Sequence, residues 1–111
     1  MGSVALTLTG MKQRLAGSVL VLTPAGEPAE ADFAGIDALS VGHKGVVLDL
    51  SEVPYLSSQG VVALLGLQAR LKCPFVLAAP APLVKRILHQ AGIASVLPLH
   101  ASVEAALASL P

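Results

Sequence analysis

Three short apolar segments constrain the fold of this chain more than any other feature of its sequence. They are residues 18–23, 45–50 and 75–79, and Val, Leu, Phe and Ala make up most of each. Continuous apolar runs of this length are typical of strands that are buried on both faces of a sheet. Helical patterns lie between them, so the sequence predicts strand–helix–strand units and a largely parallel sheet.

Four segments have the apolar spacing and the terminal residues of helices: 30–41, 58–71, 82–91 and 103–110. Either Ser57 or Ser58 can cap the second helix, and Ser102 can cap the fourth. Pro82 suits the first position of the third helix. The second helix is apolar nearly all round, so we expect it either to be fully buried or to offer one face to a partner.

Two weaker strand patterns complete the predicted sheet, one at residues 4–9 and one at residues 96–99. Lys12 and Arg14 are interpreted as a polar connection between the first two strands. The sequence therefore predicts a single α/β domain over residues 1–111, with a mostly parallel mixed β-sheet of about five strands covered by about four helices.

The composition excludes several classes of protein. Of the 111 residues, 54% are hydrophobic, which is the opposite of a disordered composition. Seven Lys and Arg balance seven Asp and Glu, whereas nucleic-acid binders and polybasic membrane anchors need surplus positive charge. We see neither a signal peptide nor an uninterrupted membrane-spanning run, and the single Cys73 fits a reducing compartment. We therefore expect a cytoplasmic protein that binds no nucleic acid directly and does not insert into membranes.

The charges are segregated along the chain. Residues 27–52 hold six acids and one base, whereas residues 70–86 hold four bases and no acid. Two interpretations remain open: ordinary solvated surface, or a charged face that steers a complementary partner.

No motif indicates catalysis, a cofactor or a metal. His43, His89 and His100 lack the spacing of metal ligands, and no phosphate-binding glycine loop is present. Ser58, a histidine and Asp49 are the residue types of a catalytic triad. However, no serine lies in the G-x-S-x-G motif that forms a nucleophile elbow. We therefore predict that the protein is not an enzyme.

The most informative stretch is residues 46–65, which read VVLDLSEVPYLSSQGVVALL. It predicts a buried strand, a short loop, and then two serines at the start of an apolar helix. Taken alone, this pattern needs no more than capping of the helix by a serine hydroxyl.

The stretch also resembles the signature of the STAS domain, the sulphate-transporter and anti-sigma-factor-antagonist family. That signature has V-x-L-D-L-S followed by D-S-[ST]-G and an apolar helix. Residues 80–93 and 102–107 resemble two later helices of the family, so the likeness covers nearly the whole chain. The resemblance implies a STAS-like fold.

The resemblance places the family's phosphorylated serine on Ser58, with Ser57 as the second candidate. Ser57 stands where the family has aspartate, and Gln59 stands where it has Ser or Thr, whereas Gly60 agrees. A serine at a helix N-terminus is a position where the helix dipole and free N–H groups tolerate a phosphate.

The resemblance implies an anti-sigma factor antagonist in a partner-switching pathway. Its partner would be an anti-sigma factor and serine kinase of the histidine-kinase-like ATPase type, which brings ATP and phosphorylates Ser58. The expected partner-binding residues lie at the start of the apolar helix: Ser57, Gln59, Gly60, Val61, Val62 and Leu65. A weak homodimer is a further expectation.

An alternative from the same family is a STAS binding subunit of a membrane lipid ABC transport complex, without a phosphorylation cycle. The two residues that flank Ser58 and the high apolar content favour this alternative. A third class is an enzyme that uses Ser58 as its nucleophile. For this class, no sequence motif places a general base beside Ser58.

Overall fold

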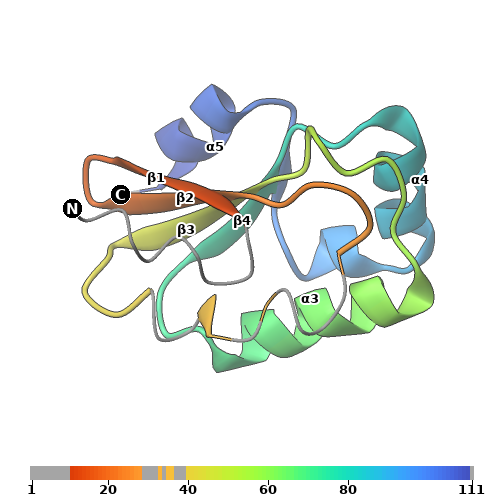
Figure 1. Ribbon diagram of the computed structural model, residues 1–111, viewed down its shortest axis with the longest axis horizontal. Coiled ribbons are helices and arrows are strands. Elements are labelled where there is room, and N and C mark those ends of the chain that lie inside the picture. Colours follow the sequence, from red (N-terminus) through yellow and green to blue (C-terminus); the bar gives the residue numbers. More distant parts are fainter. Residues whose placement is uncertain (1–10, 29–32, 34, 37–39, 111) are drawn as a thin grey trace.

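The computed structural model describes residues 11–28, 33, 35, 36 and 40–110. A five-stranded mixed sheet lies at its centre, with the strands in sequence order (Figure 1). Its strands are β1 (Lys12–Ala16), β2 (Val19–Thr23), β3 (Gly45–Asp49), β4 (Phe75–Ala78) and β5 (Leu99–His100). β1 is antiparallel to β2, and the other neighbours are parallel. The predicted mostly parallel sheet is confirmed.

The described residues contain three α-helices and one short 3₁₀ helix, against about four helices predicted. They are α3 (Ser58–Arg70), α4 (Pro82–Gln90), η2 (Ile93–Ser95) and α5 (Val103–Ser109). The three α-helices confirm the second, third and fourth predicted helices. The first predicted helix, at 30–41, falls mainly outside the described residues, although Phe33 and Ile36 are described and are buried.

The prediction of a polar connection at Lys12 and Arg14 is wrong, because both lie in β1. A two-residue turn of Gly17 and Ser18 joins β1 to β2, and Ala16 pairs with Val19. Gly17 has φ 63°, which suits the first central position of a tight hairpin turn. β1 is at one end of the strand order and its side chains are mostly exposed, so it lacks the apolar pattern by which buried strands are found. The strand predicted at 4–9 lies outside the described residues.

The last predicted strand is displaced. Its expected range was 96–99, but β5 begins at Leu99 and includes His100. The N–H groups of Val96 and Leu97 both donate to the carbonyl of Ile93, which closes the turn of η2. These two donors are therefore used locally and cannot join a ladder, so pairing with β4 begins later.

The sheet has a large and a small apolar cluster, one on each face. In β3, Val46 and Leu48 belong to the larger cluster, whereas Val47, between them, belongs to the smaller one. The larger cluster includes buried residues of α3 and α4, and the smaller includes Val103 and Ala106 of α5. Figure 1 shows α3 and α5 on opposite sides of the sheet.

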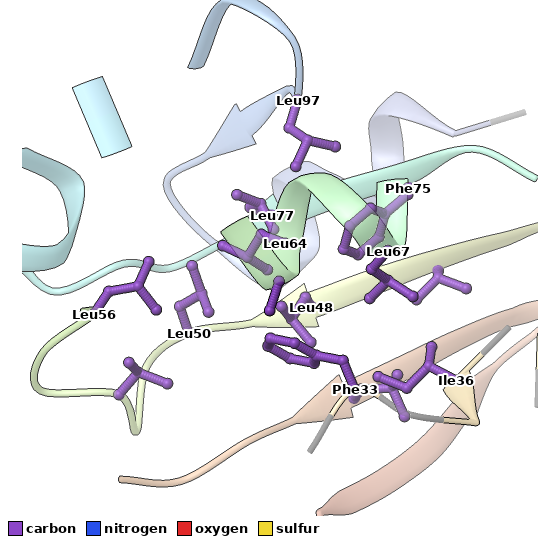
Figure 2. Close-up of a cluster of buried hydrophobic side chains, with 14 of the residues drawn as sticks. Phe33, Ile36, Leu48, Leu50, Leu56, Leu64, Leu67, Phe75, Leu77 and Leu97 are labelled. Atoms are coloured by element: carbon purple, nitrogen blue, oxygen red, sulfur yellow. The ribbon is translucent and has the colours of Figure 1, made fainter. Parts of the chain in front are cut away.

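The larger cluster fixes the position of α3. Leu64 and Leu67 of this helix have no exposed surface, and both pack in the same cluster as Leu48 and Phe33 (Figure 2). One side of α3 is therefore held against the sheet, and the position of its first turn follows from this packing.

Candidate functional site

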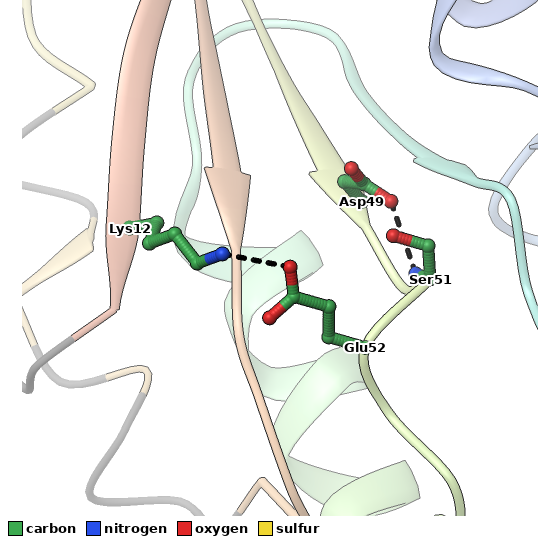
Figure 3. A network of polar contacts seen from close by, with 4 residues as sticks. All are labelled: Lys12, Asp49, Ser51 and Glu52. Carbon is green, nitrogen blue, oxygen red and sulfur yellow. Dashed lines mark hydrogen bonds and ion pairs between the residues drawn. The ribbon is translucent and has the colours of Figure 1, made fainter.

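The loop after β3 is shaped by two carboxylates with separate structural roles (Figure 3). Asp49 Oδ1 accepts a hydrogen bond of 3.0 Å from the backbone N–H of Ser51, a local turn that ends the strand. Glu52 Oε2 forms an ion pair of 2.7 Å with Lys12 Nζ of β1. Asp49 and Glu52 thus shape the loop. The Lys12–Glu52 ion pair is exposed and therefore contributes little to the stability of the fold.

Between this loop and the start of α3, two buried residues flank two exposed ones. Val53 and Leu56 are buried, whereas Pro54 and Tyr55 between them are exposed. Leu56 belongs to the larger cluster, so it anchors the chain immediately before the helix. Ser57 and Ser58 follow Leu56 directly, so this buried anchor fixes their position at the surface.

Ser57 is the N-cap of α3. Its backbone is extended, with φ −77° and ψ 170°, and its Oγ accepts a hydrogen bond of 3.1 Å from the N–H of Gly60. This is the standard geometry by which a serine satisfies a free N–H group at a helix start. Of the two serines that the sequence offered as caps, the structure therefore selects Ser57.

Replacing Ser57 by alanine is expected to lower the free energy of unfolding by about 1 kcal/mol, because the N–H of Gly60 loses its acceptor. Chemical denaturation monitored by circular dichroism measures this change. Ser57→Asp is the matched control and should retain most of the stability, since aspartate also caps helices. A Ser57→Ala protein as stable as the unsubstituted chain would contradict the capping role.

Ser58 is the first residue of α3 and its side chain is exposed. Among the described residues, no hydrogen bond to its hydroxyl is found, whereas the Ser57 oxygen is already engaged. The first turn of α3 has no acidic residue. The exposed Ser58 side chain therefore lies at the positive end of the helix dipole.

Gly60 has a packing role. A Cβ atom at this position would lie 3.0 Å from Leu56 Cδ1 and 3.1 Å from the carbonyl oxygen of Pro28. Both distances are tighter than ordinary van der Waals contact, so a larger residue here would displace the Leu56 side chain or the Pro28 backbone by a few tenths of an ångström. Gly60, one of the residues expected to bind a partner, is buried in the free chain.

The remaining predicted contact residues divide between the surface and the interior. Gln59, Val62 and Leu65 are exposed, with 66% of Val62 and 37% of Leu65 accessible. Val61 is partly buried and packs against the larger cluster. An open cavity of about 320 Å³ is lined by Ser58, Gln59, Val62 and Ala63.

Ser58, Val62 and Leu65 therefore share one outer face of α3, at the helical spacing of four and then three residues. We call these three residues the α3 face. Tyr55, which no sequence pattern singled out as a surface residue, is 48% exposed and lies three residues before Ser58. The preceding Pro54, which is typical of an exposed loop, was the signal that could have identified it.

Within the described part of the chain, no group of three His, Cys, Asp or Glu side chains could hold a metal ion. Burial raises the pKa of the Cys73 thiol, an effect that its hydrogen bond with Ser40 only partly offsets. The thiol is thus protonated at neutral pH and poorly nucleophilic. No described helix is both long enough and apolar enough to span a bilayer.

A family model of the STAS domain matches residues 12–106. The chain belongs to the STAS domain family. The match covers the sheet, α3, α4 and most of α5, including the loop that carries Ser57 and Ser58. No curated protein sequence matches the chain.

Three solved structures have a similar fold. An anti-sigma factor antagonist from Mycobacterium paratuberculosis has a TM-score of 0.80 and 25% sequence identity, over 90% of this chain and 92% of that one. The unphosphorylated anti-sigma factor antagonist SpoIIAA has a TM-score of 0.68 and 18% identity, over 87% and 92%. A sulfate transporter family protein from Wolinella succinogenes has a TM-score of 0.76 and 17% identity, over 86% and 87%. The last two likenesses concern the fold alone.

Proposed function

We propose that this chain acts, as one STAS domain over residues 1–111, as an anti-sigma factor antagonist in a partner-switching pathway. In its unmodified form it binds an anti-sigma factor through the α3 face. Phosphorylation of Ser58 by that partner, a serine kinase of the histidine-kinase-like ATPase type, ends the complex. The observation that carries the proposal is the exposed Ser58 hydroxyl beside exposed Val62 on one helix face. The 25% identical structure of an anti-sigma factor antagonist supports it.

The physical basis of the switch is the charge of a phosphate. Phosphorylation adds about 1.5 to 2 negative charges at neutral pH. The free domain tolerates this charge, because the first turn of α3 is positively polarised and has no acid of its own. In a complex, the same charge would be buried against the partner that covers Val62 and Leu65. Burial of a charge without a cationic mate costs several kcal/mol, so the complex dissociates while the fold persists.

Incubation of the full chain with its cognate anti-sigma kinase and ATP tests this proposal. We expect one phosphate per chain, which peptide mapping by mass spectrometry assigns to Ser58. Ser57 should remain unmodified because its hydroxyl caps α3. The Ser58→Ala variant is the control and should incorporate no phosphate. Phosphate found on neither serine, with a kinase that binds the chain, would refute the phosphorylation step.

A second candidate function is a STAS binding subunit of a membrane lipid ABC transport complex, with no phosphorylation cycle. The departures from the family motif at Ser57 and Gln59 favour this alternative, because both lie next to the modification site. Co-purification with a permease and an ATPase, with Ser58 unmodified, would support it over the first proposal. The neighbouring genes distinguish the two as well, since one predicts an anti-sigma kinase gene and the other a permease operon.

A further inference from the structure

An open cavity lies beside α4, at the carboxyl ends of β4 and β5. We propose that it binds the phosphate group of a small organic molecule. Its volume is about 450 Å³, which is within the usual range of small-ligand sites. Ligands of parallel α/β sheets commonly bind beyond the carboxyl ends of the strands. The lining residues are Pro80, Lys85, His89, Ala94, Leu99, His100 and Ala101.

Lys85 and His89 provide the chemistry that selects an anion. They lie four residues apart in α4, so they share one face of the helix, and both line the cavity. The lysine ammonium is a positively charged donor of three hydrogen bonds, and the imidazole donates at least one more. Among the described residues, no acid lines the cavity. An anionic oxygen therefore finds donors there and no carboxylate to repel it.

One further cation lies on the same helix. Arg86 is exposed and follows Lys85 directly in α4. A local excess of positive charge raises the concentration of anions near the surface and speeds their association. Arg70 and Lys72 line a different cavity together with residues 40–43, so they do not contribute to this site.

His100 lines this cavity and also a second cavity beside α5. It pairs with Ala78, which belongs to the smaller cluster on the α5 face. Paired residues of neighbouring strands point to the same face of a sheet, so the His100 side chain lies on the α5 face and is not a ligand of the proposed site.

The apolar residues that line the cavity indicate that the ligand has an organic part as well as a phosphate group. Pro80, Ala94 and Leu99 contribute apolar surface to the cavity. Neither Ser58 nor any other residue of the α3 face lines it. The proposed ligand site is therefore separate from the proposed phosphorylation site, and its test does not depend on the partner switch.

Titration of the ¹⁵N-labelled full chain, followed by two-dimensional NMR, tests the proposal. Inorganic phosphate and glycerol 3-phosphate are the probes, and potassium chloride at matched ionic strength is the control. We expect saturable shifts at the amides of Lys85, His89, Ala94 and residues 99–101, with tighter binding of glycerol 3-phosphate. Lys85→Ala/His89→Ala should weaken binding by about tenfold or more, whereas Arg86→Ala should change it by less than about threefold.

The substitutions are on the surface of α4, so we expect all variants to fold, which their spectra will verify. Shifts that do not saturate, or equal shifts with chloride, would overturn the site. An Arg86→Ala loss as large as that of the double variant would also overturn it, because general surface charge would then explain the binding. Glycerol 3-phosphate that binds no tighter than phosphate would refute the organic part of the ligand.

Discussion

Replacing Leu64 by alanine is expected to lower the free energy of unfolding by about 3 kcal/mol. Leu64 has no exposed surface and lies near the middle of α3. Its side chain belongs to the cluster that joins the helix to β3 and β4 (Figure 2). The substitution removes buried methyl groups and leaves a cavity that the neighbouring side chains fill only in part.

Urea denaturation of the two proteins measures this loss. Val62→Ala is the matched control, because it truncates an apolar side chain on the same helix that is 66% exposed. We expect this control to change the stability by less than about 0.5 kcal/mol. If both substitutions cost the same, the inner and outer faces of α3 have been assigned wrongly, and the partner-binding proposal would fail with that assignment.

Replacing Ser58 by aspartate is expected to weaken binding of the anti-sigma partner by about a hundredfold or more, which corresponds to about 2.8 kcal/mol. The carboxylate would lie on the exposed face that the partner covers, beside Val62 and without a cation in the first turn of α3. The thermal stability of the free domain should not decrease, because a negative charge at a helix start interacts favourably with the dipole. Isothermal titration calorimetry and a melting curve measure the two quantities.

Two controls separate this switch from a general effect of charge. Ser58→Ala should bind with an affinity close to that of the unmodified chain. Ser18→Asp adds the same charge at an exposed serine in the turn before β2, at the opposite end of the parallel strands from α3's first residue, and should leave binding nearly unchanged. Equal affinities of the Ser58→Asp and Ser58→Ala variants would refute the switch. An equal loss of binding affinity in the Ser18→Asp variant would refute the switch as well.

Much of the fold could be predicted because its signals are local. The apolar runs at 18–23, 45–50 and 75–79 correspond to β2, β3 and β4. Burial on both faces makes such strands recognisable without knowledge of their neighbours. The helix starts were equally accessible, since Pro82 and Ser102 satisfy or remove free backbone donors within their own first turns.

The errors arose where a segment's state depends on what it pairs with. β1 contains Lys12 and Arg14. It forms a strand because it pairs with the edge of β2, to which a tight turn connects it. β5 begins only at Leu99, because η2 uses the preceding N–H groups. Neither condition is visible in the residues of the segment itself, so propensity alone could not place these two strands.

The candidate site shows the same division. The sequence by itself determined that two serines and a glycine would precede an apolar helix after a buried strand, because capping and apolar spacing act over a few residues. Only the tertiary structure decided that Ser57 caps the helix while Ser58 faces outward, and that Leu56 and Pro28 approach Gly60 closely. These outcomes depend on how α3 is rotated against the sheet. That rotation is set by packing between residues far apart in the chain, which no local pattern contains.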